Sequence, residues 1–251
     1  MKNKTILITG AGSGIGKEIS HLLENNNKLI LIGRNLEKLQ KIKSRNPEHI
    51  DIYVCDISNT TNIETTFQKI SSLYSGIDVL INNAGISDAR PFLNYTYEKI
   101  KKIFDINVTG TIYFTKTFLP LVLKNQGAVV NIGSMFGDIA HPLYSVYSSS
   151  KFAIKGFSDA LRREYMHEGL SVSYVAPRAT QTDALDSTKD YGQYFEMNVD
   201  QPKDVAKHII ENVKKDRDNI YPPSIERIFV FIQKIFPKVI DKNLNNKINK
   251  L

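Results

Sequence analysis

The chain has 251 residues, 41% of them hydrophobic and 24% charged, and a formal net charge of +7. This size and composition suit one globular domain and exclude a disordered chain, which is poor in hydrophobic residues. A single cysteine excludes a disulfide framework and a multi-cysteine zinc site. The longest apolar run, residues 228–232, falls far short of the about twenty residues of a spanning helix, and the segment before Gly10 is too short for a signal peptide. We therefore expect a cytoplasmic protein.

The positive charge is unevenly distributed. Residues 225–251 hold six basic and two acidic side chains. This segment therefore carries more than half of the net positive charge of the chain. A nucleic-acid-binding protein typically carries a basic stripe across its fold. Because the excess belongs mainly to one terminal segment, we expect no nucleic acid as a partner.

Hydrophobic segments of two kinds alternate along the chain. Short runs rich in β-formers predict strands, and longer runs with apolar residues three or four apart predict helices. The predicted strands are 5–8, 28–32, 50–54, 78–81, 128–132 and 170–175, and the predicted helices are 15–23, 36–42, 63–73, 97–124 and 147–166. This alternation is typical of a parallel sheet with helices on both faces, so we predict a single α/β domain with a doubly wound sheet.

A glycine-rich segment follows the first predicted strand. Residues 9–16 read Thr-Gly-Ala-Gly-Ser-Gly-Ile-Gly and open the first predicted helix. Glycines let the backbone approach a ligand closely, and a helix N-terminus offers free N–H groups to a pyrophosphate. The position between strand and helix favours a dinucleotide site over a turn without a ligand. The expected contacts are Gly10, Ser13, Gly14, Ile15 and Gly16.

The end of the second predicted strand bears on the choice of coenzyme. Gly33, Arg34 and Asn35 follow it, with no acidic residue to bind the adenosine ribose hydroxyls as in NAD sites. A guanidinium can bind a 2′-phosphate through two hydrogen bonds, and Ser13 is placed to add a hydroxyl contact. We therefore predict NADP(H) in preference to NAD(H), with a solvated surface arginine as the alternative.

Several motifs together resemble the short-chain dehydrogenase/reductase family. They are the 9–16 loop, Asp56 after the third strand, Asn82-Asn83-Ala84-Gly85 after the fourth, Asn107, Ser134 after the fifth, and Tyr147-x-x-x-Lys151. The matches extend from Thr9 to about Thr182. The resemblance implies a single Rossmann-type domain with about seven parallel strands, and a homodimer or homotetramer.

The paired tyrosine and lysine suggest acid–base chemistry. Tyr147 and Lys151 lie four residues apart at the start of a predicted helix, so they share a face. A free phenol has a pKa of about 10, and a nearby ammonium lowers it. We expect Tyr147 to exchange a proton with a carbonyl or alcohol oxygen, Lys151 to hold the nicotinamide ribose, and Ser134 to orient the substrate. By resemblance, Asn107 would steady a proton-relay water. Each alone is more often structural, but together at successive strand ends they favour catalysis.

The resemblance assigns further coenzyme contacts. Asp56 and Ile57 match the adenine-binding position, with a helix N-cap as the alternative for Asp56. Asn83, Ala84 and Gly85 would line the middle of the coenzyme, with a structural turn as the alternative.

The segment after the sixth strand departs from the family pattern. Pro177 and Thr182 keep the spacing that would place them near the nicotinamide. Arg178 stands where the family usually has glycine, which reduces backbone freedom. We expect Arg178 to point outward or, as the alternative, to reach an anionic group of the substrate.

Fewer sequence motifs indicate which residues bind the substrate. His141 and Tyr144 lie between Ser134 and Tyr147 in the sequence and are expected to line the pocket. Residues 183–202 lack periodicity, which is typical of a lid, and hold Tyr191, Tyr194, Phe195 and Met197. The five histidines are scattered without metal-ligand spacing, so no metal is expected. Residues 1–222 would form the catalytic domain, including this lid.

Residues 223–251 form a basic amphipathic extension of that domain. Apolar residues 225, 228, 229, 232, 235 and 236 fall on one helical face, and Pro237 breaks the helix. Our first expectation is that the extension packs on its own or a neighbouring subunit. The second is that it touches an anionic membrane surface.

These features combine into one hypothesis. The chain would be an NADP(H)-dependent oxidoreductase that interconverts a carbonyl and a secondary alcohol on an apolar or acyl small-molecule substrate. A 3-oxoacyl-thioester reductase of lipid-type synthesis is an alternative. A non-catalytic coenzyme-sensing or scaffold protein is another, which the intact catalytic set disfavours because a binding module needs no proton donor.

Overall fold

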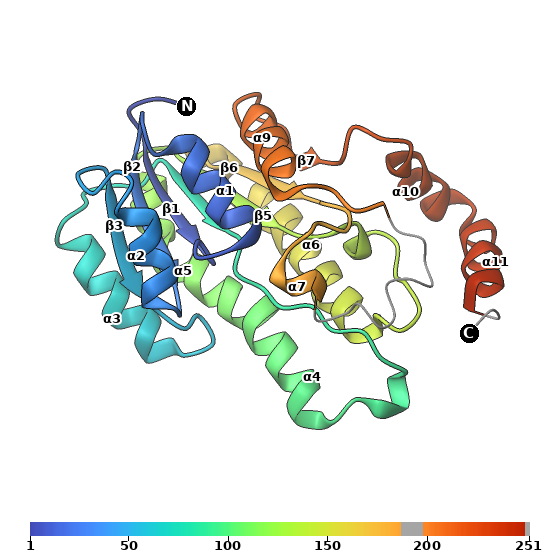
Figure 1. Ribbon diagram of the computed structural model, residues 1–251. Coiled ribbons are helices and arrows are strands. Elements are labelled where there is room, and N and C mark those ends of the chain that lie inside the picture. Colours follow the sequence, from blue (N-terminus) through green and yellow to red (C-terminus); the bar gives the residue numbers. More distant parts are fainter. Residues whose placement is uncertain (187–197, 249–251) are drawn as a thin grey trace.

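A computed structural model describes residues 1–186 and 198–248 and shows a parallel sheet of seven strands at its centre (Figure 1). The strands are β1 (Thr5–Thr9), β2 (Lys28–Gly33), β3 (Ile50–Val54), β4 (Val79–Asn82), β5 (Ala128–Ile132), β6 (Ser171–Val175) and β7 (Asn219–Ile220). Their order is β3-β2-β1-β4-β5-β6-β7. The order reverses between β1 and β4, where doubly wound sheets bind ligands. The predicted fold class is confirmed.

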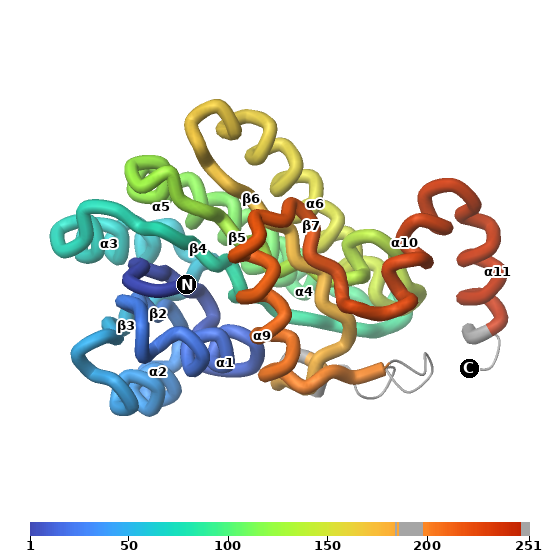
Figure 2. The backbone as a smooth tube through the Cα atoms, turned by 90° about the horizontal axis from the view of Figure 1, so that it is seen from above, coloured from blue at the N-terminus to red at the C-terminus, as the bar shows by residue number. Residues whose placement is uncertain are grey.

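Helices cover both faces of the sheet (Figures 1 and 2). They are α1 (Gly14–Leu23), α2 (Leu36–Lys43), α3 (Thr60–Ser71), α4 (Tyr97–Phe104), α5 (Thr111–Lys124), α6 (Ser145–Tyr165), α7 (Asp183–Asp186), α9 (Pro202–Val213), α10 (Glu226–Ile235) and α11 (Pro237–Ile248). Ile6 and Ile8 of β1 pack in the core with α1, α2 and α9, whereas Leu7 packs in the core with α3, α5 and α6. Alternate side chains of a buried strand thus supply two cores.

The predicted helical stretch over residues 97–124 is confirmed, but its centre is π-helical instead of α-helical. A π-helical segment, Asp105–Gly110, separates α4 from α5. Asn107 in this segment accepts the Ile86 N–H at 2.9 Å and donates to the Ile86 carbonyl at 2.9 Å. A side chain at Gly110 would clash with the carbonyl of Ile57. Contacts with the loops after β3 and β4 therefore hold this wider turn, which local periodicity does not reveal.

The chain after β6 contains the predicted lid and the C-terminal extension. The lid aromatics Tyr191, Tyr194, Phe195 and Met197 lie outside the described residues. The predicted break at Pro237 is confirmed, since α10 ends at Ile235 and Pro237 begins α11. Both views show these last two helices at the edge of the molecule, away from the sheet (Figures 1 and 2). In residues 1–186 and 198–248, no helix is both long and apolar enough to cross a bilayer.

Candidate active site

A cavity of about 1020 Å³ opens at the carboxyl ends of the central strands. It extends from the glycine-rich loop to α10 and α11. The predicted site residues that line it are Gly10, Ser13, Gly14, Ile15, Arg34, Asp56, Ile57, Asn83, Ala84, Gly85, Ser134, His141, Tyr144, Tyr147, Lys151, Pro177 and Thr182. Gly16 and Asn107 do not line it. The structure therefore gathers into one cleft residues that are spread over most of the chain.

The glycine-rich loop is shaped by close backbone contacts. Gly10 has a φ of +64°, and a Cβ there would lie 2.8 Å from the Ala84 Cα. The Asn83 side-chain amide donates to the carbonyls of Thr9 and Gly10 at 3.0 and 3.1 Å. A Cβ at Gly16 would meet the same amide and the Gly10 carbonyl, so Gly16 shapes the loop from behind. The loops after β1 and β4 are thus locked together, and the N-terminus of α1 faces the cleft as a phosphate cradle requires.

Basic side chains border the coenzyme end of the cleft. Arg34, directly after β2, is exposed and lines the same cavity as Ser13. Lys38 and Lys102 also line it, although the sequence analysis missed both. Lys38 lies in the first turn of α2, directly after the Arg34 loop, and this closeness in the sequence could have revealed it. Its ammonium pairs with Asp183 at 2.9 Å. This positive border suits a phosphate group.

Asp56 follows β3 and is held in an ionised state. Burial alone would raise its pKa, but hydrogen bonds from Ser58 and the positive charge of Arg34 lower the pKa below its ordinary value. The Ser58 N–H and hydroxyl donate to one carboxylate oxygen at 2.9 and 2.7 Å. The N-cap of α3 is Asn59, so the N-cap alternative for Asp56 is wrong.

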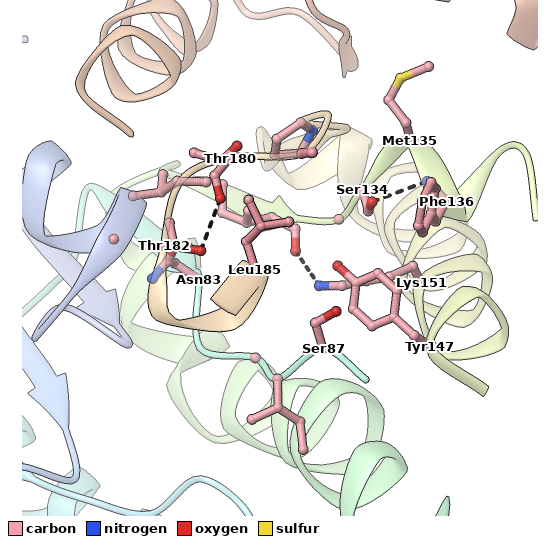
Figure 3. Close-up of a pocket in the computed structure, with 18 of the residues that line it drawn as sticks. Asn83, Ser87, Ser134, Met135, Phe136, Tyr147, Lys151, Thr180, Thr182 and Leu185 are labelled. Carbon is pink, nitrogen blue, oxygen red and sulfur yellow. Dashed lines mark hydrogen bonds between the residues drawn. The ribbon is translucent and has the colours of Figure 1, made fainter. Parts of the chain in front are cut away.

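Ser134, Tyr147 and Lys151 converge in the middle of the cleft (Figure 3). Ser134 follows β5, whereas Tyr147 and Lys151 lie one turn apart on α6. The Ser134 hydroxyl oxygen accepts the Phe136 N–H at 3.1 Å, and the Ser134 side chain hydrogen-bonds Tyr147. The Lys151 ammonium donates to the Ile132 carbonyl at 3.1 Å and lies 5.7 Å from the Tyr147 ring centroid. These groups surround one point where a substrate oxygen can bind.

Burial sets the protonation of this cluster. It raises the pKa of Tyr147 to about 12, although the hydrogen bond from Ser134 opposes the rise. Burial also lowers the pKa of Lys151 to about 8. The predicted lowering of the Tyr147 pKa by Lys151 is therefore wrong: burial raises this pKa, and Lys151, whose ammonium donates to the Ile132 carbonyl, does not offset the rise. Tyr147 is a protonated phenol at neutral pH and can donate its proton.

Asn107 supports the cluster from outside the cavity. Besides Ile86, its side-chain amide donates to the Ser150 hydroxyl on α6 at 3.1 Å. A Cβ at Gly85 would lie 3.3 Å from the Asn107 Oδ1 and 3.6 Å from the Lys151 Nζ. Asn107 thus joins the loop after β4 to α6, the helix that carries Tyr147 and Lys151. The relay of protons through a water at Asn107 stays a prediction.

Tyr174 of β6 is a functional residue that the sequence analysis missed. It is fully buried, and its hydroxyl donates to the Ser134 carbonyl at 2.8 Å. A side chain at Gly133 would clash with its ring. Lys155 lies over the same ring at 5.3 Å and forms an ion pair with the buried Asp138. Tyr174 therefore fixes the main chain of Ser134. No local motif marks it, because it is one apolar position in a strand.

Aromatic side chains form the wall beside Tyr147. His141 stacks on Phe136, with ring centroids 4.3 Å apart and planes inclined by 21°. Tyr144 is buried and meets Phe136 edge-on at 4.9 Å. Both His141 and Tyr144 line the cavity, so its wall beside Tyr147 is largely aromatic.

Comparison with known proteins identifies the family. A family model described as short chain dehydrogenase matches residues 4–192. The chain belongs to the short-chain dehydrogenase/reductase family. This confirms the resemblance drawn from the motifs, and it establishes membership of a family of oxidoreductases.

Relatives in this family are similar over most of the chain. Dehydrogenase/reductase SDR family member 7C of Xenopus tropicalis is 30% identical over 258 residues, covering 95% of this chain and 83% of the relative. Carbonyl reductase family member 4 of Xenopus laevis is 34% identical over 190 residues, covering 75% and 80%. The structure of 3-ketoacyl-(acyl-carrier-protein) reductase from Brucella melitensis, complexed with NADH, has a TM-score of 0.80 at 20% identity and covers 88% of this chain and 95% of that one. The last likeness concerns the fold alone.

Arg178 distinguishes this member from the usual family pattern. The expectation that it points outward is wrong, because its guanidinium donates to both carboxylate oxygens of Asp200 at 2.7 Å and to Glu226 at 2.8 Å. Main-chain hydrogen bonds pair Asp200 with residues 179 and 181. Thr182, just beyond, contacts Gly14, where a Cβ would lie 2.8 Å from its methyl carbon. Arg178 therefore connects the start of α10, through Asp200, to residues 179–182. Thr182 at the end of this segment lies against the glycine-rich loop.

Proposed function

We propose that this chain is an NADP(H)-dependent reductase that converts an apolar carbonyl compound into a secondary alcohol. The observation that carries the proposal is the protonated Tyr147, half-buried and hydrogen-bonded to Ser134 in a cleft with a phosphate cradle at one end and apolar walls at the other. The protein is expected to work as a homodimer or homotetramer, which stays a prediction.

Ser134, Tyr147 and the coenzyme would each contribute one part of the carbonyl reduction. A bound nicotinamide coenzyme would supply the hydride. The hydroxyls of Ser134 and Tyr147 would hydrogen-bond the carbonyl oxygen and stabilise the negative charge that develops there. Tyr147 would then transfer its proton to that oxygen. A phenol with a pKa near 12 is almost fully protonated at neutral pH, so Tyr147 would hold the proton that reduction requires.

The border of the coenzyme end supports NADP(H). Arg34, Lys38 and Lys102 surround the place where the adenosine would lie. No acidic side chain stands directly after β2, where an NAD site holds the one that accepts hydrogen bonds from the ribose hydroxyls; Arg34 and Asn35 stand there instead. A 2′-phosphate would meet complementary charge there.

A panel of carbonyl compounds and alcohols, followed by NADPH and NADH absorbance, tests the proposal. Tyr147→Phe should reduce turnover by about 10³-fold, since it removes the general acid, while NADPH binding persists. Tyr113→Phe is the matched control, because Tyr113 hydrogen-bonds Glu64 far from the cleft and should leave turnover unchanged. Equal turnover by wild type and Tyr147→Phe would contradict the proposal.

The panel also separates the alternatives. It includes a 3-oxoacyl thioester, because one structural relative is described as a 3-ketoacyl-(acyl-carrier-protein) reductase. A strong preference for the thioester over simple ketones would favour that reaction. Coenzyme binding without turnover of any carbonyl or alcohol would favour the non-catalytic coenzyme sensor.

A further inference from the structure

The helices α10 and α11 leave a large apolar surface uncovered. Seven of their large apolar side chains are between 41% and 66% exposed, although Val230 and Ile240 anchor the pair on the core. Exposed apolar surface on this scale marks an interaction site. We call these residues the C-terminal apolar patch: Ile225, Ile228, Phe229, Phe231, Ile235, Phe236 and Val239.

The patch is continuous with the wall of the catalytic cleft. Phe229 and Val239 are exposed members of the patch and also line the cavity that holds Tyr147. Ile232 and Leu244, which are half-buried, line the same cavity further in. An apolar path therefore leads from the outer surface of α10 and α11 to the proton donor.

Exposed basic side chains border the patch. Arg227 and Lys234 lie one helical turn before and after Phe231, and Lys238 and Lys242 lie one turn apart on α11. All four are exposed. Glu226, the acidic residue at the start of α10, is already paired with Arg178. The surface thus combines apolar side chains with a positive border.

We propose that α10 and α11 dock on an anionic lipid bilayer and hold the mouth of the catalytic cleft against it. An interfacial helix buries apolar side chains among the acyl chains while its lysines meet the anionic headgroups. A second copy of this chain fits less well, because a two-fold contact through the same patch would bring its basic borders together. A carbonyl substrate dissolved in the bilayer could then enter along the apolar path, a step that rests on the proposed function.

The Arg178 ion pairs make such docking useful to the active site. They connect Glu226, in the first turn of α10, to Asp200. Main-chain hydrogen bonds connect Asp200 to residues 179 and 181, and the neighbouring Thr182 lies against Gly14. Helices held on a membrane through the patch would therefore keep a fixed position relative to the coenzyme loop.

Sedimentation with vesicles tests the docking directly and needs neither coenzyme nor substrate. The 251-residue chain should bind vesicles of phosphatidylcholine with phosphatidylserine, bind phosphatidylcholine alone much more weakly, and lose binding as salt increases. Phe231→Ser with Phe236→Ser should weaken binding by about tenfold for each side chain removed. Lys234→Glu with Lys238→Glu should weaken it by about fivefold or more for each lysine. Leu93→Ser is the matched control, because Leu93 is exposed elsewhere on the surface and should bind like wild type.

Two results would overturn the inference. One is the absence of wild-type binding to phosphatidylserine vesicles at low salt. The other is equal vesicle binding by wild type and the double phenylalanine variant. Sedimentation velocity without lipid identifies the rival occupant: a dimer that the double variant abolishes, with no vesicle binding by wild type, would assign the patch to a second copy.

An activity measurement extends the test to substrate entry. Phe231 and Phe236 do not line the cavity, so their replacement should preserve turnover of a short water-soluble ketone. Turnover of a long-chain ketone presented in phosphatidylserine vesicles should fall with the loss of vesicle binding. No turnover of either ketone by wild type would refute the proposed function, while the sedimentation result would still decide the docking. Equal turnover of the vesicle-borne ketone by both proteins would refute entry from the bilayer.

Discussion

The two ends of the catalytic cleft are built in different ways. At the coenzyme end, main-chain atoms make the essential contacts, as where Gly10 approaches Ala84 too closely to admit a side chain. At the substrate end, side chains make the essential contacts; for example, the Arg178 guanidinium forms ion pairs with both Asp200 and Glu226. Backbone contacts of this closeness admit little variation, whereas side-chain contacts can change without altering the sheet. The coenzyme end therefore follows from the fold, and the choice of substrate depends on side chains.

The pH dependence of the reaction sharpens this comparison most, because Tyr147 lies where the two ends meet. Oxidation of an alcohol needs the Tyr147 phenolate, whose pKa is raised to about 12, so the oxidation rate should rise about tenfold per pH unit through the neutral and alkaline range. Reduction needs the protonated phenol and should show no such rise. Initial rates in both directions at constant ionic strength measure this. An oxidation rate that levels off near neutral pH would show that the phenol is more acidic than its burial implies.

Replacing Arg34 changes only the coenzyme end. Arg34→Ala should raise the KM for NADPH by about 10- to 100-fold through loss of charged hydrogen bonds to the 2′-phosphate, and should leave the KM for NADH nearly unchanged. Steady-state kinetics with both coenzymes at fixed substrate provide the measurement. Lys41→Ala, on the exposed side of α2, is the control. If both coenzymes are affected alike, Arg34 does not select between them.

Adding a methyl group tests whether backbone contacts govern the coenzyme end. Gly10→Ala combines a φ of +64° with a Cβ 2.8 Å from the Ala84 backbone, and should lower the free energy of unfolding by about 1–3 kcal/mol and impair coenzyme binding. Gly156→Ala is the matched control, because nothing lies within 4 Å of its Cβ in α6. It should raise the free energy of unfolding by about 0.5–1 kcal/mol. Urea unfolding and coenzyme titration of the two variants give the comparison.

Removing the Arg178 charge should affect mainly the substrate end. Arg178→Met should cost about 1–2 kcal/mol of unfolding free energy and raise the KM for a large apolar substrate more than it raises the KM for the coenzyme, because Arg178 reaches the coenzyme loop only indirectly, through Asp200 and residues 179–182. Arg178→Lys should restore part of the loss. An equal rise in both KM values would show that the two ends are not independent.

The same ion pairs predict a response to acid. Burial would raise the pKa of Glu226, but hydrogen bonds from Ser224, its own N–H, Asn198 and Arg178 lower it to about 2. A carboxyl group with a lowered pKa stabilises the folded state fully above its unfolded value of about 4.5 and loses that contribution as pH falls toward 2. Wild type should therefore lose more stability than Arg178→Met between neutral pH and pH about 3. Urea unfolding at both pH values checks this, and an equal loss would contradict it.

Local sequence patterns were enough to predict six of the seven strands, the glycine-rich loop and the pairing of Tyr147 with Lys151. Strand and helix periods are set by residues a few positions apart, so the six local strands and the break at Pro237 could be predicted. The spacing of Tyr147 and Lys151 on one helical turn is likewise a local property. The short strand β7 had no local signal, because two residues contain no period.

Contacts between segments that are distant in the sequence could not be predicted and became visible in the folded chain. The π-helical turn at Asp105–Gly110 depends on Ile86, the position of Ser134 depends on Tyr174, and Arg178 finds Glu226 at the start of α10. The protonation of Tyr147 follows from burial by many residues at once. Hydrogen bonds, ion pairs and desolvation depend on distance in space. Sequence patterns describe distance along the chain, so these features emerge only when the chain has folded.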